Sequence, residues 1–224
     1  MRIALLVLLL LGGCAASDSA TQEAEGRPSD EFRTTAAPRV VGHRRDRPPP
    51  QVTEAAASER SSAIGKPAPD FELLDQEERP VSLSALRGQW VVLYFYPADD
   101  TPGCTCQANE FTRLIQSFHH ANAKVIGVSV DRPEIHRRFI RKYNLRIPLL
   151  SDPDRRVMRE YGAWVDIPRG PAAPGMVIRS TYLIDPTGRI AWHWPEVIPQ
   201  GHAQRVMDRL NALQRLAPRQ PDPT

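Results

Sequence analysis

The alternation of apolar and polar positions divides the chain into two unlike parts. From Ala15 to about Ser62, polar and charged residues and prolines prevail, and no period of 2 or 3.6 runs through the segment. Because such a segment cannot bury enough surface to offset its ordering entropy, we predict a disordered tether over 15–62. From there the apolar pattern becomes regular, which predicts one globular domain over 63–216. The proline-broken tail, 217–224, is expected to fray.

Several short segments of the domain have the patterns of strands. Residues 70–73 and 80–83 alternate around a polar turn. Trp90–Tyr96 is a continuous β-branched and aromatic run, which is typical of a central strand covered on both faces. Residues 124–130 predict a second buried strand, and 148–150 predict a short one.

Helical spacing separates these strands. Ser84 is expected to cap a short helical turn ending at Gly88. Longer helices are predicted over 104–120, from Asp131-Arg132-Pro133 onward with Ile135, Phe139 and Ile140 inward, from Asp152 to Tyr161, and over about 201–216.

Near the C-terminal end, three prolines and two glycines within 165–175 predict an irregular loop. Strands are predicted over 176–184 and 188–194, joined by a turn around Asp185-Pro186-Thr187-Gly188. Alternating strands and helices followed by a hairpin and a last helix predict an α/β domain, with a mixed β-sheet flanked by helices.

Composition narrows the function classes. A chain of 224 residues with 41% hydrophobic residues supports one core and leaves little room for a second domain. The net charge is +3, and the arginines are spread along the chain without interleaved aromatic residues. We therefore expect no nucleic-acid partner.

The N-terminal 14 residues have the features of an export signal. Met1-Arg2 is followed by an apolar run to Leu11 and then by Gly12-Gly13-Cys14. The run is shorter than the ~18 residues of a membrane-spanning helix. Its ending resembles the lipobox of bacterial lipoproteins, which predicts acylation of Cys14 and an anchored protein outside the cytoplasm, on the periplasmic side. An ordinary secretory signal is the alternative.

Cys104 is the strongest candidate for chemistry. It follows an apolar strand and a proline-bearing loop, and it stands at the predicted first turn of a helix. Unpaired N–H groups and the helix dipole favour a thiolate there, so the position suits a nucleophile. The alternative is a buried structural thiol.

The residues around Cys104 resemble those of a known family. Pro97-x-x-x-Thr101-x-x-Cys104 is similar to the active-site signature of the peroxiredoxins, and Tyr96–Thr105 resembles their peroxiredoxin Q subgroup, also called bacterioferritin comigratory protein. The similarity extends from about Ile64 to Arg215. It implies a thioredoxin-like fold and a thiol-dependent peroxidase that reduces hydrogen peroxide and organic hydroperoxides.

The resemblance also implies roles for individual residues. Cys104 would attack the peroxide and become a sulfenic acid. Thr101 would hydrogen-bond the peroxide, with a helix cap as the alternative or additional role, and Arg179 would support the thiolate and the polarised peroxide. Pro97 would shield the thiolate and fix the loop. The backbone N–H groups of Gly103 and Cys104 would be further donors.

The sequence offers two routes for the regeneration of Cys104. Many members of the subgroup carry a resolving cysteine five residues after the nucleophile, where this chain has Asn109. Cys106 lies two residues away, so its side chain points to another helix face and a disulfide with Cys104 would require the first turn to unwind. We favour a one-cysteine cycle with an external thiol or thioredoxin-like partner over resolution by Cys106. An acylated Cys14 would not take part.

Other functions fit the sequence less well. No histidine or cysteine pair has a recognised metal-ligand spacing, so we expect no metal or other cofactor. The main alternative is a lipid-anchored thiol-disulfide oxidoreductase of the thioredoxin type, which normally needs the Cys-x-x-Cys pair that is missing here. A copper-delivery protein of similar fold would need Cys-x-x-x-Cys and a ligand histidine. The protein is expected to be a monomer.

Overall fold

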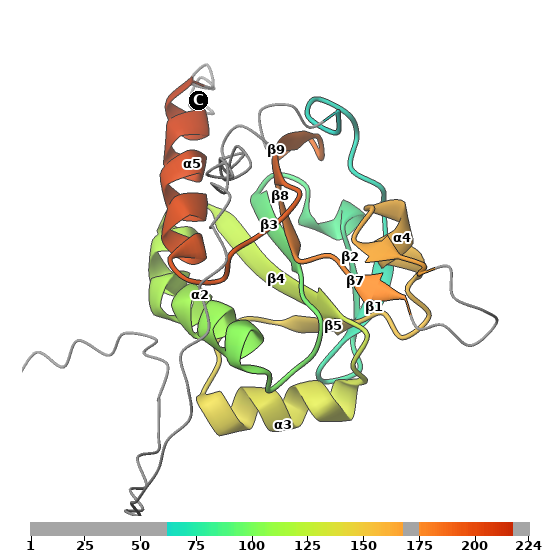
Figure 1. The fold of residues 1–224 in the computed structure, drawn as a ribbon. Coiled ribbons are helices and arrows are strands. Elements are labelled where there is room, and N and C mark those ends of the chain that lie inside the picture. The colour runs from blue at the N-terminus through green and yellow to red at the C-terminus, as the bar shows by residue number, and fades with distance from the viewer. Residues whose placement is uncertain (1–61, 168–174, 217–224) are drawn as a thin grey trace, which may run out of the picture. The chain divides into compact units, whose positions relative to one another are not determined.

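The computed structural model describes residues 62–167 and 175–216. The predicted signal peptide with Cys14, nearly all of the predicted tether and the predicted tail lie outside these residues. Within them, one mixed sheet of seven strands has the order β2-β1-β5-β4-β3-β8-β9 (Figure 1). Its strands in chain order are β1 (Glu72–Asp75), β2 (Pro80–Ser82), β3 (Trp90–Phe95), β4 (Ala123–Ser129), β5 (Leu149–Ser151), β8 (Ser180–Ile184) and β9 (Ile190–Trp194).

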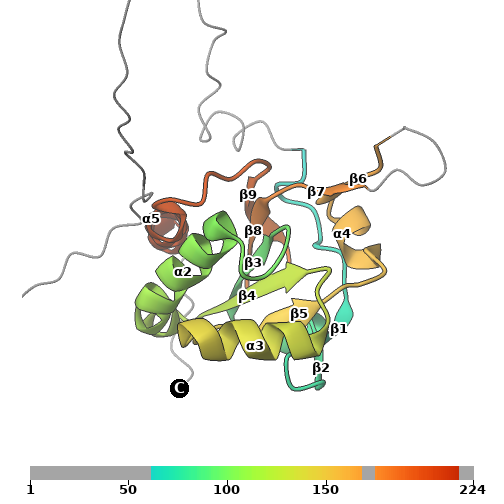
Figure 2. The ribbon, with the colours of Figure 1, turned by 60° about the horizontal axis from the view of Figure 1, so that its bottom comes forward.

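Helices cover both faces of this sheet. The longer helices lie on one face, namely α2 (Pro102–His120), α3 (Pro133–Tyr143) and α5 (His202–Leu216). The other face carries α4 (Arg156–Glu160) and the 3-10 turn η1 (Ser84–Leu86) (Figure 2). The predicted mixed sheet flanked by helices is therefore confirmed.

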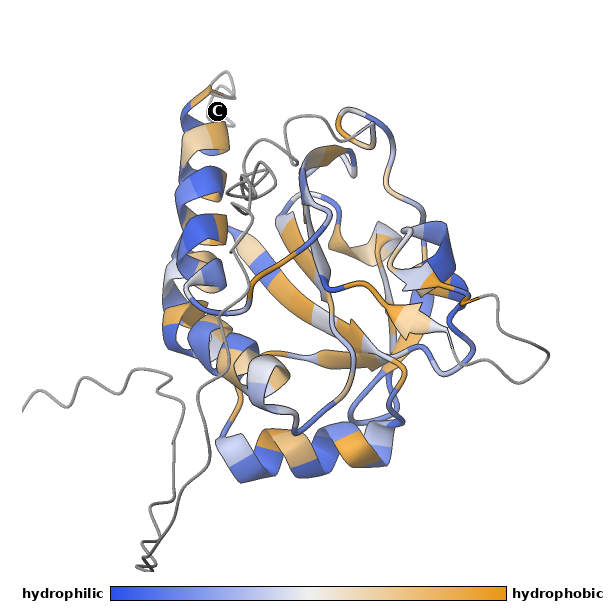
Figure 3. Ribbon diagram, in the orientation of Figure 1, coloured by the Kyte–Doolittle hydropathy of each residue, from blue (hydrophilic) through white to orange (hydrophobic). Residues whose placement is uncertain are grey.

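The central strand β3 shows why the sequence folds in this way. Its side chains alternate between two cores: Val92 and Tyr94 pack under α2, whereas Val91, Leu93 and Phe95 pack on the opposite face. All six residues of the strand are buried. Figure 3 shows this as apolar colour in the middle of the sheet and polar colour on the outer faces of the helices. A run without alternation thus forms a strand that is covered on both sides.

The parallel strands of the sheet share one edge at which loops come together. Strands β3, β4 and β5 run parallel to one another. Their carboxyl ends therefore meet at the same edge, and the loops after Phe95 and Ser129 come together there. In open α/β sheets this edge is where ligands bind.

Several predicted boundaries change. Residue Leu83, and not Ser84, is the N-cap of η1, and Ser84 lies inside the turn. Helix α2 begins at Pro102 and α4 at Arg156. The carboxylate of Asp152, the predicted helix start, accepts the N–H of Met158 in the first turn of α4 at 2.8 Å.

The predicted strand over 176–184 is interrupted. Its first part, β7 (Met176–Val177), pairs with β6 (Trp164–Val165), which falls at the edge of the predicted irregular loop. Its second part, β8, pairs with β3. The interruption leaves Arg179 between two different sheets, where its carbonyl accepts the N–H of Val197 at 3.0 Å.

In the described part of the chain, no helix has both the length and the apolar character needed to cross a bilayer.

Candidate active site

Cys104 lies in the first turn of α2. Thr101 is the N-cap, with extended backbone angles, and Pro102 is the first helical residue, where its fixed φ suits a helix start. The N–H of Thr105 bonds the carbonyl of Thr101 at 2.8 Å. The N–H groups of Gly103 and Cys104 precede that first helical bond, as the backbone-donor prediction requires. The Cys104 thiol is free and 2% exposed.

The guanidinium of Arg179, which directly precedes β8, reaches the sulfur. Its Nη2 lies 3.3 Å from Cys104 Sγ, and its Nη1 donates to Gln107 Oε1 at 2.7 Å. Gln107 stands one helical turn after Cys104 and is fully buried. The structure thus brings Arg179 to Cys104, as predicted, and Gln107 fixes the plane of the guanidinium.

The Arg179 guanidinium and Pro199 lie close to the backbone of Gly103. A Cβ on Gly103 would stand 3.4 Å from Arg179 Nη2 and 3.4 Å from Pro199 Cγ, which is ordinary van der Waals contact. The guanidinium therefore lies against the first turn of α2.

Thr101 is oriented by its own loop. Its hydroxyl donates to the carbonyl of Ala98 at 3.1 Å, and it makes no side-chain capping bond. Thr101 is thus the N-cap residue of α2, as its second predicted role requires, but its hydroxyl makes no capping bond. Because a carbonyl only accepts, the single hydroxyl proton is used, and Thr101 Oγ1 is an acceptor toward any other group. The nearby Pro97 is exposed, and its shielding role stays a prediction.

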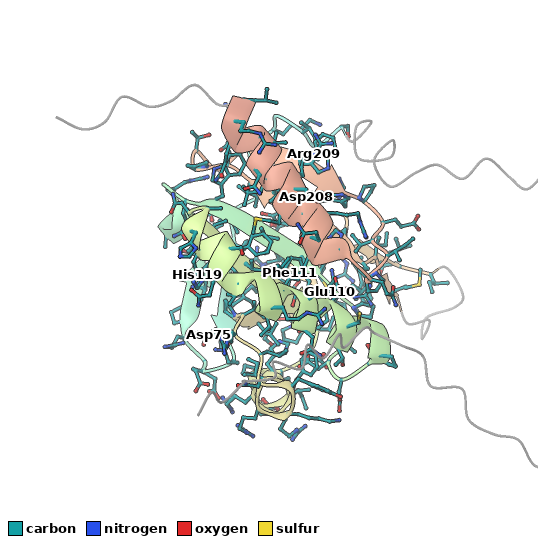
Figure 4. The ribbon with its side chains drawn as sticks, turned by 90° about the vertical axis from the view of Figure 1, so that its left-hand side faces the viewer. Asp75, Glu110, Phe111, His119, Asp208 and Arg209 are labelled. Atoms are coloured by element: carbon teal, nitrogen blue, oxygen red, sulfur yellow. The ribbon has the colours of Figure 1, made fainter. Side chains whose placement is uncertain are left out.

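Cys106 points away from this cluster. Its Sγ lies 3.9 Å from Oε1 of Glu110, and that carboxylate also accepts the N–H of Gly201 at 2.7 Å, just before α5. Figure 4 shows Glu110 on the face of α2 that lies beside α5. Cys104 and Cys106 thus contact different partners, Arg179 and Glu110.

A buried polar network that the sequence analysis missed holds the loop before Cys104. The carboxylate of Asp99 accepts the hydroxyl of Tyr96 at 2.7 Å and lies 2.7 Å from Nδ1 of His136 on α3. The side chains of His136 and Asp99 are 0% and 1% exposed. Nε2 of His136 lies 3.2 Å from the carbonyl of Leu150, which can only accept, so that nitrogen carries a proton.

Two further contacts fasten the same loop. Asp131, which follows β4, accepts the backbone N–H of Asp99 on its Oδ2 at 2.7 Å. Asp100 has a left-handed backbone with φ of 61°, and its carboxylate binds Lys142 at 2.6 Å and Tyr143 at 2.6 Å. Hydrogen bonds from these two α3 side chains lower the pKa of Asp100.

Tyr94 lies in the same core as Cys104. Burial, followed by the negative charges of Asp99 and Cys104, raises the pKa of Tyr94 well above its usual value, and Arg179 opposes this shift. The phenol is therefore neutral at physiological pH. No described residue accepts or donates at its hydroxyl.

The signal for the missed residues was weak. His136 falls among Ile135, Phe139 and Ile140 on the apolar face of a helix, and a histidine at such a position indicates a buried polar partner without naming it. In the described ranges, no three histidine, cysteine or acidic side chains are grouped as metal ligands.

The chain is similar to a known protein family over most of its described residues. Residues 64–193 match the model of the AhpC/TSA family. A putative peroxiredoxin bcp from Coxiella burnetii is 42% identical over 150 residues, which cover 67% of this chain and 99% of that protein. The chloroplastic peroxiredoxin Q of Sedum lineare is 41% identical over 150 residues, covering 66% of this chain and 78% of the relative.

Solved structures show the same similarity. The bacterioferritin comigratory protein of Xanthomonas campestris superposes with a TM-score of 0.61 at 34% identity, covering 64% of this chain and 91% of that one. BcpB, a peroxidoxin from Mycobacterium tuberculosis, superposes with a TM-score of 0.61 at 34% identity, covering 67% of this chain and 97% of that one. These structures confirm the expected thioredoxin-like fold.

Proposed function

Because the chain belongs to the AhpC/TSA family and is a thiol peroxidase of the peroxiredoxin Q type, we propose that Cys104 reduces hydroperoxides in a one-cysteine cycle. The observation that carries the proposal is the pairing of Cys104 Sγ with Arg179 Nη2 at 3.3 Å, at the N-terminus of α2. Both the guanidinium and the helix dipole favour negative charge at this point.

The proposed first step transfers one oxygen to sulfur. The Cys104 thiolate attacks the terminal oxygen of a hydroperoxide, so an S–O bond forms and the O–O bond breaks. The attacked oxygen keeps its hydrogen, and Cys104 becomes a sulfenic acid. The electron pair of the broken bond leaves on the other oxygen as an alkoxide or hydroxide, which takes a proton from water. Sulfur is oxidised and the peroxide is reduced.

The residues of the site support different parts of this step. Thr101 Oγ1 accepts the O–H of the hydroperoxide, because its own proton is committed to Ala98. Nη2 of Arg179 carries two N–H groups, so it serves both the sulfur and the leaving oxygen as charge moves between them. The N–H groups of Gly103 and Cys104 complete the set of donors.

The geometry favours an external thiol as reductant. Asn109 occupies the position of the usual resolving cysteine. Cys106 faces Glu110 and not Cys104. We therefore propose that a small thiol or a thioredoxin-like protein attacks the sulfenic acid, forms a mixed disulfide with loss of water, and that a second thiol then releases Cys104.

Mass spectrometry after one equivalent of peroxide tests the cycle. We expect a Cys104 sulfenic acid that dimedone traps, in wild type and in Cys106→Ser alike. Steady-state turnover with a thiol donor should be lost in Cys104→Ser and retained in Cys106→Ser. A product two hydrogens lighter than the dithiol that does not react with dimedone, or equal loss of turnover in both variants, would contradict the one-cysteine cycle.

We also propose that the protein is exported and anchored through lipid on Cys14. The support is the apolar run that ends in Leu11-Gly12-Gly13-Cys14. Several acyl chains on one residue exceed the two signals that stable anchoring requires. Wild type should fractionate with membranes and incorporate labelled palmitate, whereas Cys14→Ala should do neither. Equal membrane association of both would refute the anchor.

A further inference from the structure

One peptide group connects the buried network to the hydroxyl of Thr101. The carbonyl of Ala98 and the N–H of Asp99 belong to the same planar peptide and point in opposite directions. The N–H donates to Asp131 Oδ2 at 2.7 Å, and the carbonyl accepts the Thr101 hydroxyl at 3.1 Å. The chain of contacts therefore runs from carboxylate to peptide to hydroxyl without a gap.

We propose that Asp131 is a positioning residue for the peroxidase reaction, which orients the Thr101 hydroxyl through the Ala98–Asp99 peptide. This inference rests on the proposed function. A carboxylate on the N–H side polarises the peptide and makes its carbonyl a stronger acceptor. The Thr101 proton is thereby kept on Ala98, and Oγ1 presents lone pairs to the hydroperoxide.

The alternative orientation would slow the reaction. A Thr101 hydroxyl released from Ala98 is free to rotate and no longer presents a fixed acceptor. The hydroperoxide O–H then loses a preorganised partner in the transition state, so the barrier rises. The peptide therefore has to be held in one orientation.

Asp131 is itself fixed in position. Its Oδ2 also accepts the hydroxyl of Ser129 at 3.0 Å, and the oxygen of Ser129 accepts the N–H of Asp131 at 3.0 Å. Its carbonyl accepts the hydroxyl of Ser151 at 2.6 Å. Both serines end buried parallel strands, so the carboxylate is anchored to the interior strands of the sheet.

The Asp99–His136 pair fixes the same peptide from its side-chain end. Both carboxylate oxygens of Asp99 are used, one by Tyr96 and the other by His136. Since Nε2 of His136 carries a proton, the pair has one more proton between Nδ1 and the carboxylate. If Asp99 is changed to asparagine, a neutral imidazole accepts the amide N–H at Nδ1, and every bond is kept. Because these bonds are kept, we expect Asp99→Asn to hold the loop as the wild-type pair does.

The experiment compares two reactions of the same sulfur. One is the second-order rate of Cys104 oxidation by hydrogen peroxide, and the other is alkylation of Cys104 by iodoacetamide above pH 9, which does not use Thr101. In Asp131→Asn, an acceptor remains but the charge is lost, so we expect peroxide oxidation to slow about 3- to 10-fold. Asp131→Ala should slow it about 10- to 30-fold. Alkylation should stay within about twofold.

A double-mutant cycle isolates the route through Thr101. In a Thr101→Val background, Asp131→Asn should change the peroxide rate by less than about twofold, because the hydroxyl is no longer present. The peroxide oxidation rate of Asp99→Asn should stay within about threefold of the wild-type rate. The rate of Asp99→Ala should decrease by about as much as that of Asp131→Ala. Asp152→Asn is the matched control, since Asp152 is also a buried strand-end carboxylate that accepts a backbone N–H but lies outside the loop.

The outcomes separate this inference from the proposed function. Wild-type Cys104 that peroxide does not oxidise would overturn the function itself. If wild type is oxidised but Asp131→Asn slows the reaction equally with and without the Thr101 hydroxyl, or slows alkylation in proportion, only the positioning role is overturned. Asp131→Asn retains an acceptor for both of its donors, so it is informative even where Asp131→Ala does not fold.

Discussion

Replacing Arg179 with methionine removes one cation from the site and leaves a chain of similar length. The donor at 3.3 Å from Cys104 Sγ is lost where negative charge passes from sulfur to the leaving oxygen. Loss of such a donor costs about 2.7–4 kcal/mol in the transition state, or roughly 10²- to 10³-fold in rate. We expect peroxide oxidation of Cys104 to slow by this factor. Arg179→Lys keeps the charge but loses the paired N–H donors of the guanidinium, so its oxidation rate should be about 10- to 30-fold lower than that of wild type.

The same change also affects stability, which allows the two effects to be separated. Gln107 is fully buried, its Nε2 has no partner among the described residues, and Arg179 is the donor to its Oε1. Arg179→Met would leave the whole amide unpaired, at a cost of about 1–3 kcal/mol in unfolding free energy. Adding Gln107→Leu should restore much of the stability but none of the rate.

Stopped-flow oxidation by hydrogen peroxide and urea unfolding measure these two quantities. Arg209→Met is the matched control, because that guanidinium stacks on Trp192 at 3.5 Å and changes the net charge equally outside the site. An oxidation rate in Arg179→Met within threefold of wild type, or an equal loss in Arg209→Met, would refute the role given to Arg179.

Two further predictions concern the scaffold. A Cβ added at Gly127 would lie 2.6 Å from the hydroxyl of Tyr94 and 2.9 Å from Cδ2 of Leu149, both buried. Gly127→Ala should therefore destabilise the fold by about 1–3 kcal/mol in urea unfolding, and adding Tyr94→Phe should recover part of this loss. A destabilisation below about 0.5 kcal/mol would contradict the packing argument. Burial lowers the pKa of His193 to about 4, below its unfolded value of 6.5. Between these pH values the unfolded chain binds more protons than the folded chain, so the free energy of unfolding falls as pH decreases from about 6.5 toward 4. Between pH 7 and 5, His193→Gln should lose less unfolding free energy than wild type, and parallel curves would contradict the assignment.

The sequence by itself predicted most of the elements in their order and placed Cys104, the proposed nucleophile, at a helix start. Continuous apolar runs predicted β3 and β4, because strands covered on both faces have no polar side to alternate with. Cys104 could be placed at a helix start because its signals are local: a strand, a proline loop and a glycine within a few residues. Arg179 was found only through family resemblance, since an arginine near a strand has no local mark of function.

Only the tertiary structure decided which side chains complete the site. Gln107 meets Arg179 across 72 positions of the chain, and Asp99 meets His136 across 37. These pairs form because the carboxyl ends of the parallel strands β3 and β4 and the amino end of the antiparallel strand β8 meet at one edge of the sheet. Asp131 likewise accepts the N–H of Asp99 across 32 positions. A hydrogen bond between groups far apart in sequence depends on how the elements pack, so local sequence patterns do not predict it.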